Sequence, residues 1–309
     1  MKRLERMPVP LLPALVGALT LSNVYYGMGF EAVRHITMGT AAIVLLLYLI
    51  KIVCWPGTVM REYQNTVTGS LYGAFPMIMM ILGSYYHDYL PGFGKVLWLV
   101  AIGIHGCHIL VFTYKNVIRK REVDTFLPSW FVTYNGIMVS CVVGGGMEEK
   151  GILQFIMFYG IIIYLILIPI MILRLLRVKI KETAYHTQAI VLAPCSFCLV
   201  SYINVIGEPN MGLALFLYGC VLLSLLFVIT KLPYFFSYSF VPGFAGLTFP
   251  MAIAIVAGQK MSGYLNTMGN EKLAYAVKQL SGLQIYLTTM IIGYVLLNFL
   301  IMAMKIERK

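Results

Sequence analysis

Residues 242–258 read Pro-Gly-Phe-Ala-Gly-Leu-Thr-Phe-Pro-Met-Ala-Ile-Ala-Ile-Val-Ala-Gly. The segment is apolar enough to lie in a bilayer, yet Pro250 stands inside it. A proline inside a helix removes one backbone hydrogen bond and frees the carbonyl four residues earlier, here that of Gly246. In lipid, such a carbonyl needs cover from protein or from a water-filled cavity. The stretch therefore predicts a kinked helix that faces the interior of a membrane protein.

The composition of the whole chain agrees with this setting. Of its 309 residues, 60% are hydrophobic and 11% are charged. Soluble domains are about 45–50% apolar and about 25% charged. This small number of charged side chains cannot cover a water-exposed surface. The chain is therefore predicted to be a polytopic, all-α membrane protein in a lipid bilayer. Disordered, secreted and nucleic-acid-binding proteins are excluded together.

Spanning helices need about 20 mostly apolar residues, and ten runs of this kind follow one another with short connections. They predict a single transmembrane domain over residues 1–309, with spans near 8–28, 34–55, 69–87, 93–114, 127–146, 151–174, 186–206, 211–230, 237–258 and 279–304.

The basic residues indicate the orientation of these spans, because cytoplasmic loops carry an excess of Lys and Arg. With both termini inside, most of the 23 basic residues lie on the inner side, among them Lys120, Arg121, Lys179, Lys181, Arg308 and Lys309. The outer side holds Arg34, Lys95, Lys150, Lys260, Lys272 and Lys278. The prediction is an inner (plasma) membrane protein with cytoplasmic N- and C-termini.

Proline falls mainly in the odd-numbered runs, which contain Pro8, Pro10 and Pro13, Pro76, Pro128, Pro194, and Pro242 and Pro250. Among the even-numbered runs, only the sixth has an interior proline, Pro169. Phe-Pro-Met occurs at 75–77 and again at 249–251. This alternation predicts five helical hairpins, with an inner ring of five kinked helices around a pore and five plainer helices outside. The alternative is a bundle in which prolines are merely tolerated.

All 12 acidic residues fall in loops or at the ends of the runs. Proton- or cation-coupled carriers usually keep a buried carboxylate for the coupling ion. An uncharged pore with basic residues at its inner mouth suits anions better than cations. Small anions are therefore the predicted substrates.

Four stretches resemble the tellurite-resistance/dicarboxylate transporter family, which includes the slow-type anion channels of plant guard cells. They are residues 246–255, Pro128-Ser-Trp-Phe-Val-Thr-Tyr-Asn-Gly136, Phe158-Tyr-Gly160 running on to Leu167-Ile-Pro169 and Arg174, and Ala189-Ile-Val-Leu-Ala-Pro194. The resemblance implies the ten-helix, five-hairpin architecture, a homotrimer and one pore per protomer. It also implies that Phe249 plugs the pore.

For Phe249, the residues alone leave two interpretations open. It is either a core aromatic or a ring that stands in the channel beside the kink at Pro250, where Gly243 and Gly246 have no side chains. The other residues expected to line the pore or form kinks are Pro13, Phe75, Pro76, Phe131, Pro194 and Phe197.

Two further pairs have alternative interpretations. His105 and His108 lie on one helical face, either as a ligand or relay pair or as interhelical packing residues, and packing is favoured. Cys195 and Cys198 have metal-ligand spacing, but a single such pair in an apolar helix favours packing. No metal site or cofactor is predicted. No nucleophile, base and orienting group can be combined within the membrane, so the protein is not expected to be an enzyme.

The prediction is an anion channel or facilitator gated by a phenylalanine. The alternative is a proton-coupled carrier of a C4-dicarboxylate or of an oxyanion such as tellurite or sulfite. A third class, a receptor or scaffold, would carry no flux. Substrates differ widely across the family that the chain resembles, so the resemblance does not identify the anion.

Overall fold

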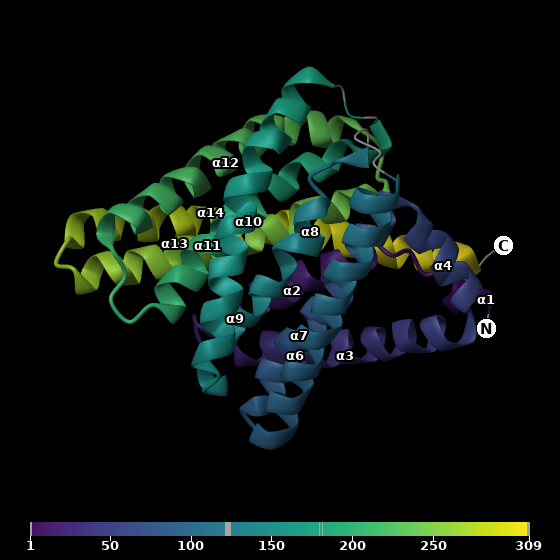
Figure 1. Cartoon of the computed structure of the whole chain (residues 1–309), viewed down its shortest axis with the longest axis horizontal. Coiled ribbons are helices and arrows are strands. Elements are labelled where there is room, and N and C mark those ends of the chain that lie inside the picture. Colours follow the sequence, from purple (N-terminus) through teal and green to yellow (C-terminus); the bar gives the residue numbers. More distant parts are fainter. Residues whose placement is uncertain (1, 121–124, 179, 181, 308–309) are drawn as a thin grey trace.

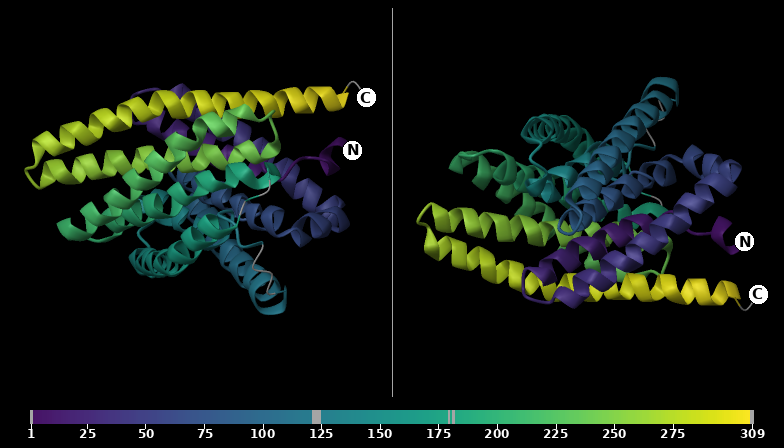
Figure 2. Two further views of the ribbon diagram at one scale, coloured as in Figure 1. Left: turned by 90° about the horizontal axis from the view of Figure 1, so that it is seen from above. Right: turned by 90° about the horizontal axis from the view of Figure 1, so that it is seen from below.

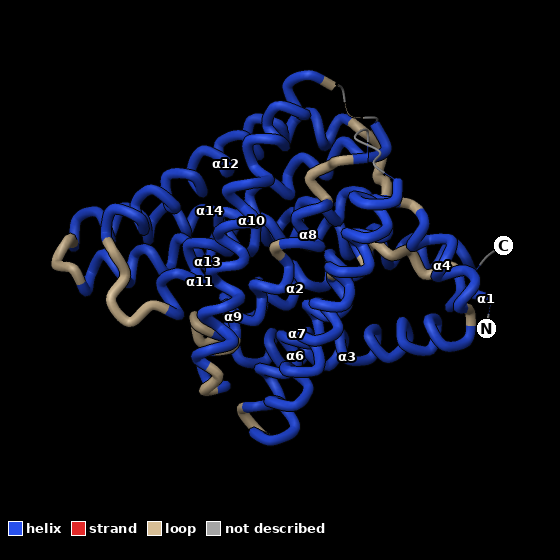
Figure 3. The backbone as a smooth tube through the Cα atoms, viewed as in Figure 1, coloured by secondary structure: helices blue, strands red, loops and turns tan. Residues whose placement is uncertain are grey.

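A computed structural model describes residues 2–120, 125–178, 180 and 182–307, and these residues form helices without any strand (Figures 1 and 3). Some charged residues assigned above to loops or termini lie outside the described residues: Arg121, Glu122, Asp124, Lys179, Lys181, Arg308 and Lys309.

Five long helices are mostly exposed. They are α3 (Glu31–Cys54), α7 (Pro91–Thr113), α10 (Lys150–Arg177), α12 (Met211–Ser237) and α14 (Glu271–Glu307). In the most apolar stretch of each, between 22% and 33% of the residues are buried. Their exposed side chains are largely apolar, such as Leu283 and Met290 on α14. An apolar exterior of this extent suits contact with lipid rather than water.

The segments that precede these helices are mostly buried, and most of them are shorter or interrupted. They comprise α2 (Leu11–Tyr26), α5 (Thr66–Leu71), α6 (Ala74–His87), α8 (Trp130–Tyr134), η3 (Gly136–Met138), α9 (Val139–Val143), η4 (Gly145–Met147), η5 (Glu182–Val191), α11 (Leu192–Val205), η6 (Pro242–Phe244) and α13 (Ala245–Thr267). In the apolar stretches within Thr66–His87 and Ala184–Val205, 89% of the residues are buried, and in Pro242–Thr267 83% are. Burial therefore alternates along the chain, as the prolines suggested.

Three further helices complete the described chain: α1 (Lys2–Glu5), α4 (Pro56–Gln64) and η1, a π-helix over Tyr114–Lys120. Each long helix packs on the segment before it, as α14 does along α13. Figure 2 shows these last two helices side by side, with the N- and C-terminal ends of the chain at the same end of the molecule.

The buried segments also contact one another. Helix α2 packs on α6 and α13, α11 packs on α9 and α13, and α6 packs on α9. Following these contacts from α2 through α6, α9, α11 and α13 leads back to α2.

Eight helical segments among the described residues are long and apolar enough to cross a membrane, and the shorter α2 is also apolar. The predicted run 127–146 is not one of them, because it is divided into α8, η3 and α9. The run 237–258 corresponds to a helix over Ala245–Thr267, and the run 279–304 to one over Glu271–Glu307. Hydropathy misplaces these ends because helices continue into polar residues.

The prolines differ in one respect from the expectation. Pro13, Pro76 and Pro194 lie in the first turns of α2, α6 and α11, and Pro250 lies inside α13. The carbonyls four residues before Pro13 and Pro76 accept hydrogen bonds at 3.0 Å from the amides of Leu12 and Phe75. These two interruptions therefore tighten the backbone instead of leaving a free carbonyl.

The expectation that Pro169 is the sole interior proline of the even-numbered runs was wrong. Pro233 also lies inside a long helix, because α12 extends to Ser237, beyond the apolar run that ended at residue 230.

Candidate functional site

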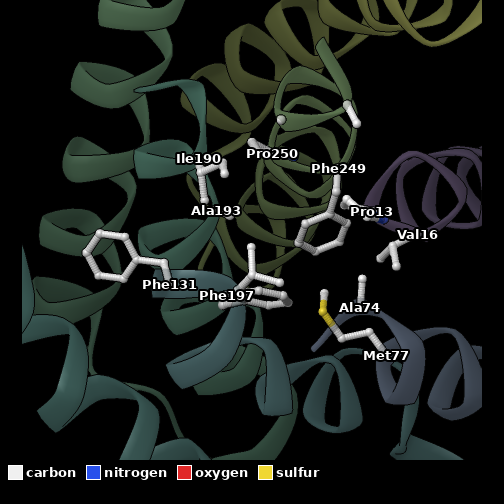
Figure 4. Close-up of a pocket in the computed structure, with 13 residues that line it drawn as sticks. Pro13, Val16, Ala74, Met77, Phe131, Ile190, Ala193, Phe197, Phe249 and Pro250 are labelled. Carbon is white, nitrogen blue, oxygen red and sulfur yellow. The ribbon is translucent and has the colours of Figure 1, made fainter. Parts of the chain in front are cut away.

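Two phenylalanines from different buried helices meet near the centre of the molecule. Phe249 lies on α13 beside Pro250, and Phe197 lies on α11. Their ring centroids are 5.1 Å apart and their planes are inclined by 37°. Figure 4 shows the two rings facing each other between side chains of the neighbouring segments. We call these two residues the phenylalanine pair.

On one side of the phenylalanine pair lies the narrow cavity, of about 20 Å³. A water needs about 10–15 Å³ of such space, so the cavity has room for about one. It lies toward the beginnings of α2, α6, α11 and α13, and its lining is uncharged: Pro13, Val16, Ala74, Met77, Phe131, Val132, Ile190, Ala193, Phe197, Ala245, Gly246, Phe249 and Pro250.

On the other side lies the wide cavity, of about 160 Å³. It is lined by Thr20, Asn23, Val24, Ile81, Val139, Val142, Val143, Phe197, Phe249, Ile253, Val256 and Gln259. Phe197 and Phe249 belong to both linings. The phenylalanine pair therefore separates one cavity from the other.

Close packing between α2 and α13 positions Phe249. A Cβ added to Gly17 would lie 2.7 Å from the backbone nitrogen of Phe249 and from the carbonyl carbon of Thr248. Only glycine permits this approach of the two helices. The Thr248 hydroxyl donates to the carbonyl of Pro13 at 3.2 Å and to that of Ala245 at 2.8 Å. Neither Gly17 nor Thr248 was singled out in the sequence, where each is one small residue among many.

The residues expected in the pore divide into two groups. Those that line the narrow cavity are Pro13, Phe131, Phe197, Gly246, Phe249 and Pro250. The ring of Phe131 lies apart from the other lining side chains in Figure 4. Gly243, Phe75, Pro76 and Pro194 are not lining residues of either cavity.

Their neighbours Ala74, Met77 and Ala193 line the narrow cavity instead. Gly246 also has a packing role, because an added Cβ would lie 3.0 Å from the carbonyl oxygen of His186 in η5.

The two histidines of α7 join that helix to its neighbours. His105 Nε2 donates to the carbonyl of Thr133 at 2.8 Å. His108 Nδ1 lies 2.9 Å from the Tyr63 hydroxyl, and its Nε2 lies 3.1 Å from the Thr133 hydroxyl. These are the contacts of interhelical histidines that hold α8 beside the narrow cavity.

The two cysteines of α11 are buried, free thiols. Cys195 Sγ contacts the Leu192 carbonyl at 3.3 Å and the Ser224 hydroxyl at 3.6 Å. Cys198 Sγ lies 4.0 Å from the Gly160 carbonyl. Both thiols therefore pack α11 against the helices around it.

Sequence reasoning missed the burial of Lys51. The Lys51 ammonium on α3 is fully buried and donates to the carbonyl of Met7 and to the carboxylate of Glu62, both at 2.7 Å. The same carboxylate accepts from the Tyr72 hydroxyl at 2.5 Å. Tyr72 lies in the short break between α5 and α6. In the sequence, Lys51 looks like an ordinary basic residue at the end of a span.

Comparison with known proteins gives two matches. A family model described as SLAC1, voltage-dependent anion channel, matches residues 14–305. The tellurite resistance protein TehA homolog of Haemophilus influenzae is 26% identical over 240 residues, which are 72% of this chain and 71% of that protein. These matches confirm the resemblance drawn from the four motifs, and the family is one of anion channels and transporters rather than enzymes. Since the family model covers residues 14–305, and therefore nearly all of the 309 residues, the chain belongs to the SLAC1 family of voltage-dependent anion channels.

Proposed function

We propose that the protein is an anion channel whose closed pore runs through the narrow and wide cavities, with Phe249 as the gate and Phe197 beside it. The observation that carries this proposal is the position of the phenylalanine pair between the two cavities. Family membership also suggests anion transport across a membrane. An apolar constriction of this kind blocks ions because it offers no group to replace the water that an ion sheds.

The proposal includes a finer architecture than the spans alone give. Five hairpins, each pairing an interrupted segment with a plainer outer helix, form one transmembrane domain over residues 1–309. The contacts that lead from α2 through α6, α9, α11 and α13 back to α2 support an inner ring around the pore. The alternation of buried and exposed helices supports the assignment of inner and outer members.

A proton-coupled carrier for a dicarboxylate or an oxyanion is the second candidate, and the TehA homolog is named for tellurite resistance. The linings of the two cavities favour the channel. Their residues are uncharged, so they offer no carboxylate for a coupling proton or cation. Four of the expected pore residues do not line either cavity, and we propose that they shape the inner segments instead: Gly243, Phe75, Pro76 and Pro194.

The orientation and assembly are part of the same proposal. The protein lies in the inner (plasma) membrane as a homotrimer with cytoplasmic termini. In a background without the native cysteines, a cysteine at Arg119 is expected to resist impermeant thiol reagents applied outside, and cysteines at Glu149 and Lys272 to react. Labelling at Arg119 from outside would refute the orientation. Crosslinking or native mass spectrometry checks the trimer.

The gate is tested with Phe249→Ala. Removing the ring joins the cavities, so chloride flux into liposomes is expected to rise strongly while the melting temperature changes little. Phe249→Leu keeps apolar bulk and should open the pore less. A packed core phenylalanine behaves differently, since its removal costs about 3–5 kcal/mol. A Phe249→Ala protein that is destabilised and no leakier than the wild type would refute the gate.

Reversal potentials separate the channel from the carrier. With the chloride gradient fixed, the reversal potential of Phe249→Ala in planar bilayers is expected to stay constant when a pH gradient is imposed. A reversal potential that follows the proton gradient would favour the carrier, and absence of flux in every variant would favour a receptor or scaffold.

A further inference from the structure

Asn23, in the last turn of α2, is a lining residue of the wide cavity. Its side-chain oxygen accepts a hydrogen bond from Nε of Arg34 at 3.0 Å. A guanidinium only donates, so this contact requires the oxygen of the amide to face Arg34. The amide NH₂ group points away from its own oxygen. The oxygen of Asn23 is thereby engaged by Arg34, and the two N–H groups are the donors that this lining residue can offer to the wide cavity.

Arg34 is itself fixed. Its side chain is 9% exposed, and its Nη2 lies 2.8 Å from a carboxylate oxygen of Asp88. The guanidinium carbon also lies 4.5 Å from the ring centroid of Tyr26 and 5.1 Å from that of Tyr85. A cation held between two aromatic rings and a carboxylate cannot reorient freely. Arg34 therefore acts as a positioning residue for the amide of Asn23.

Gln259 on α13 provides a second amide. It is exposed, lines the wide cavity, and also lines a larger cleft of about 960 Å³ that contains Lys260. The third polar lining residue, Thr20, already donates its hydroxyl to the carbonyl of Val16 at 2.9 Å. The N–H groups of Asn23 and Gln259 are thus the side-chain donors of the wide cavity. The larger cleft that Gln259 shares is lined by one cation and one anion, Lys260 and Glu208.

We propose that the wide cavity binds one small inorganic anion, which the amides of Asn23 and Gln259 hold just outside the phenylalanine pair. Since about 10–15 Å³ of such space holds one water, the 160 Å³ of the cavity admit a halide together with several waters. Amide donors bind an anion in a partly hydrated state without the strong retention of a full positive charge. The inference rests on the proposed function, for which this site is the waiting position before the gate.

The site is tested first without conduction, in crystals of the full-length wild type soaked in bromide. Anomalous density is expected in the wide cavity beside Asn23 and Gln259. Asn23→Asp keeps an oxygen for Arg34, so the fold is retained, but it replaces the donors with a carboxylate and should abolish the peak. Asn266→Asp adds the same charge at an exposed position of α13 outside the wide cavity, and should leave the peak unchanged.

Gln259→Glu provides a second test at an exposed position, where misfolding is not a concern, and should weaken the peak. Absence of bromide from the wild-type cavity overturns the site, and so does a peak that survives both Asn23→Asp and Gln259→Glu.

The second arm measures selectivity in the Phe249→Ala background. Under a KCl gradient, Asn23→Asp should move the reversal potential toward that of potassium, whereas Asn266→Asp should not. If Phe249→Ala conducts and Asn23→Asp leaves selectivity unchanged, the anion site fails while the channel stands. If Phe249→Ala does not conduct, the proposed function fails, and the bromide experiment still decides the site.

Discussion

The two cavities on either side of the phenylalanine pair share two aromatic rings and differ in almost everything else. The narrow cavity has about 20 Å³ and is lined by hydrocarbon groups, whereas the wide cavity has about 160 Å³ and includes Asn23 and Gln259. An anion can keep much of its water in the wide cavity and must lose it in the narrow one. On the proposed function, the barrier is therefore asymmetric, and its steep side lies toward the beginnings of α2, α6, α11 and α13.

The largest effect on chloride flux is expected when the ring of Phe197, the second ring between the cavities, is removed. Phe197→Ala should raise chloride flux in liposomes, as Phe249→Ala does, because either truncation joins the two spaces. The rings are in contact, so their effects should be coupled. The variant with both substitutions is expected to have a higher chloride flux than either single variant. The increase should be smaller than two independent effects would give. A Phe197→Ala protein that is folded and no leakier than the wild type would leave Phe249 as the sole barrier.

A second, intermediate effect distinguishes the two cavities by their size. In the Phe249→Ala background, Ala193→Leu adds three carbons to the narrow cavity and should return chloride flux toward the wild-type level. Val142→Leu adds one carbon to the wide cavity, which has space for it, and should leave flux unchanged. In the wild-type background, Ala193→Leu is expected to cost about 1–3 kcal/mol by overpacking. Equal loss of flux in both variants would contradict the difference between the cavities.

The smallest effect concerns the contact that holds Phe249 in place. Thr248→Val keeps the shape of the side chain but removes the hydroxyl that bonds Pro13 and Ala245. A loss of about 0.5–1.5 kcal/mol is expected, measured as a lower melting temperature in detergent. The control is Thr230→Val on α12, whose exposed hydroxyl bonds only the carbonyl of Phe227 in its own helix. Equal shifts of the melting temperature in the two variants would show that the hydrogen bond between α2 and α13 contributes nothing to stability.

Much of the fold could be predicted from the sequence, because the bilayer leaves few choices. Low charge and long apolar runs indicate a membrane protein, and the uneven spread of proline indicates which segments are buried. The same signals do not locate helix ends, since a helix continues wherever its backbone is satisfied. This is why Pro233 was not recognised as an interior proline of α12.

The candidate site was only partly predictable. Phe249 stands beside a proline in a motif that resembles a known family, so it could be singled out. Phe197 was expected near the pore, but its contact with Phe249 depends on how α11 packs on α13. The roles of Gly17, Asn23 and Lys51 likewise depend on residues from other helices, and no local pattern indicates such partners.

The contact between α2 and α13 has a consequence for the biogenesis of the protein. Thr248 and Pro13 are 235 positions apart, yet they are joined by a hydrogen bond beside the closest backbone approach described above. A ribosome that adds about 5–20 residues per second needs roughly 10–50 s to cover that distance. Throughout this interval, the face of α2 that contains Gly17 lacks its partner helix, α13. Helix α2 can pack on α3 and α6 soon after they are made, but its contact with α13 must wait until α13 has been made. On the proposed function, the gate that carries Phe249 is completed only at that stage.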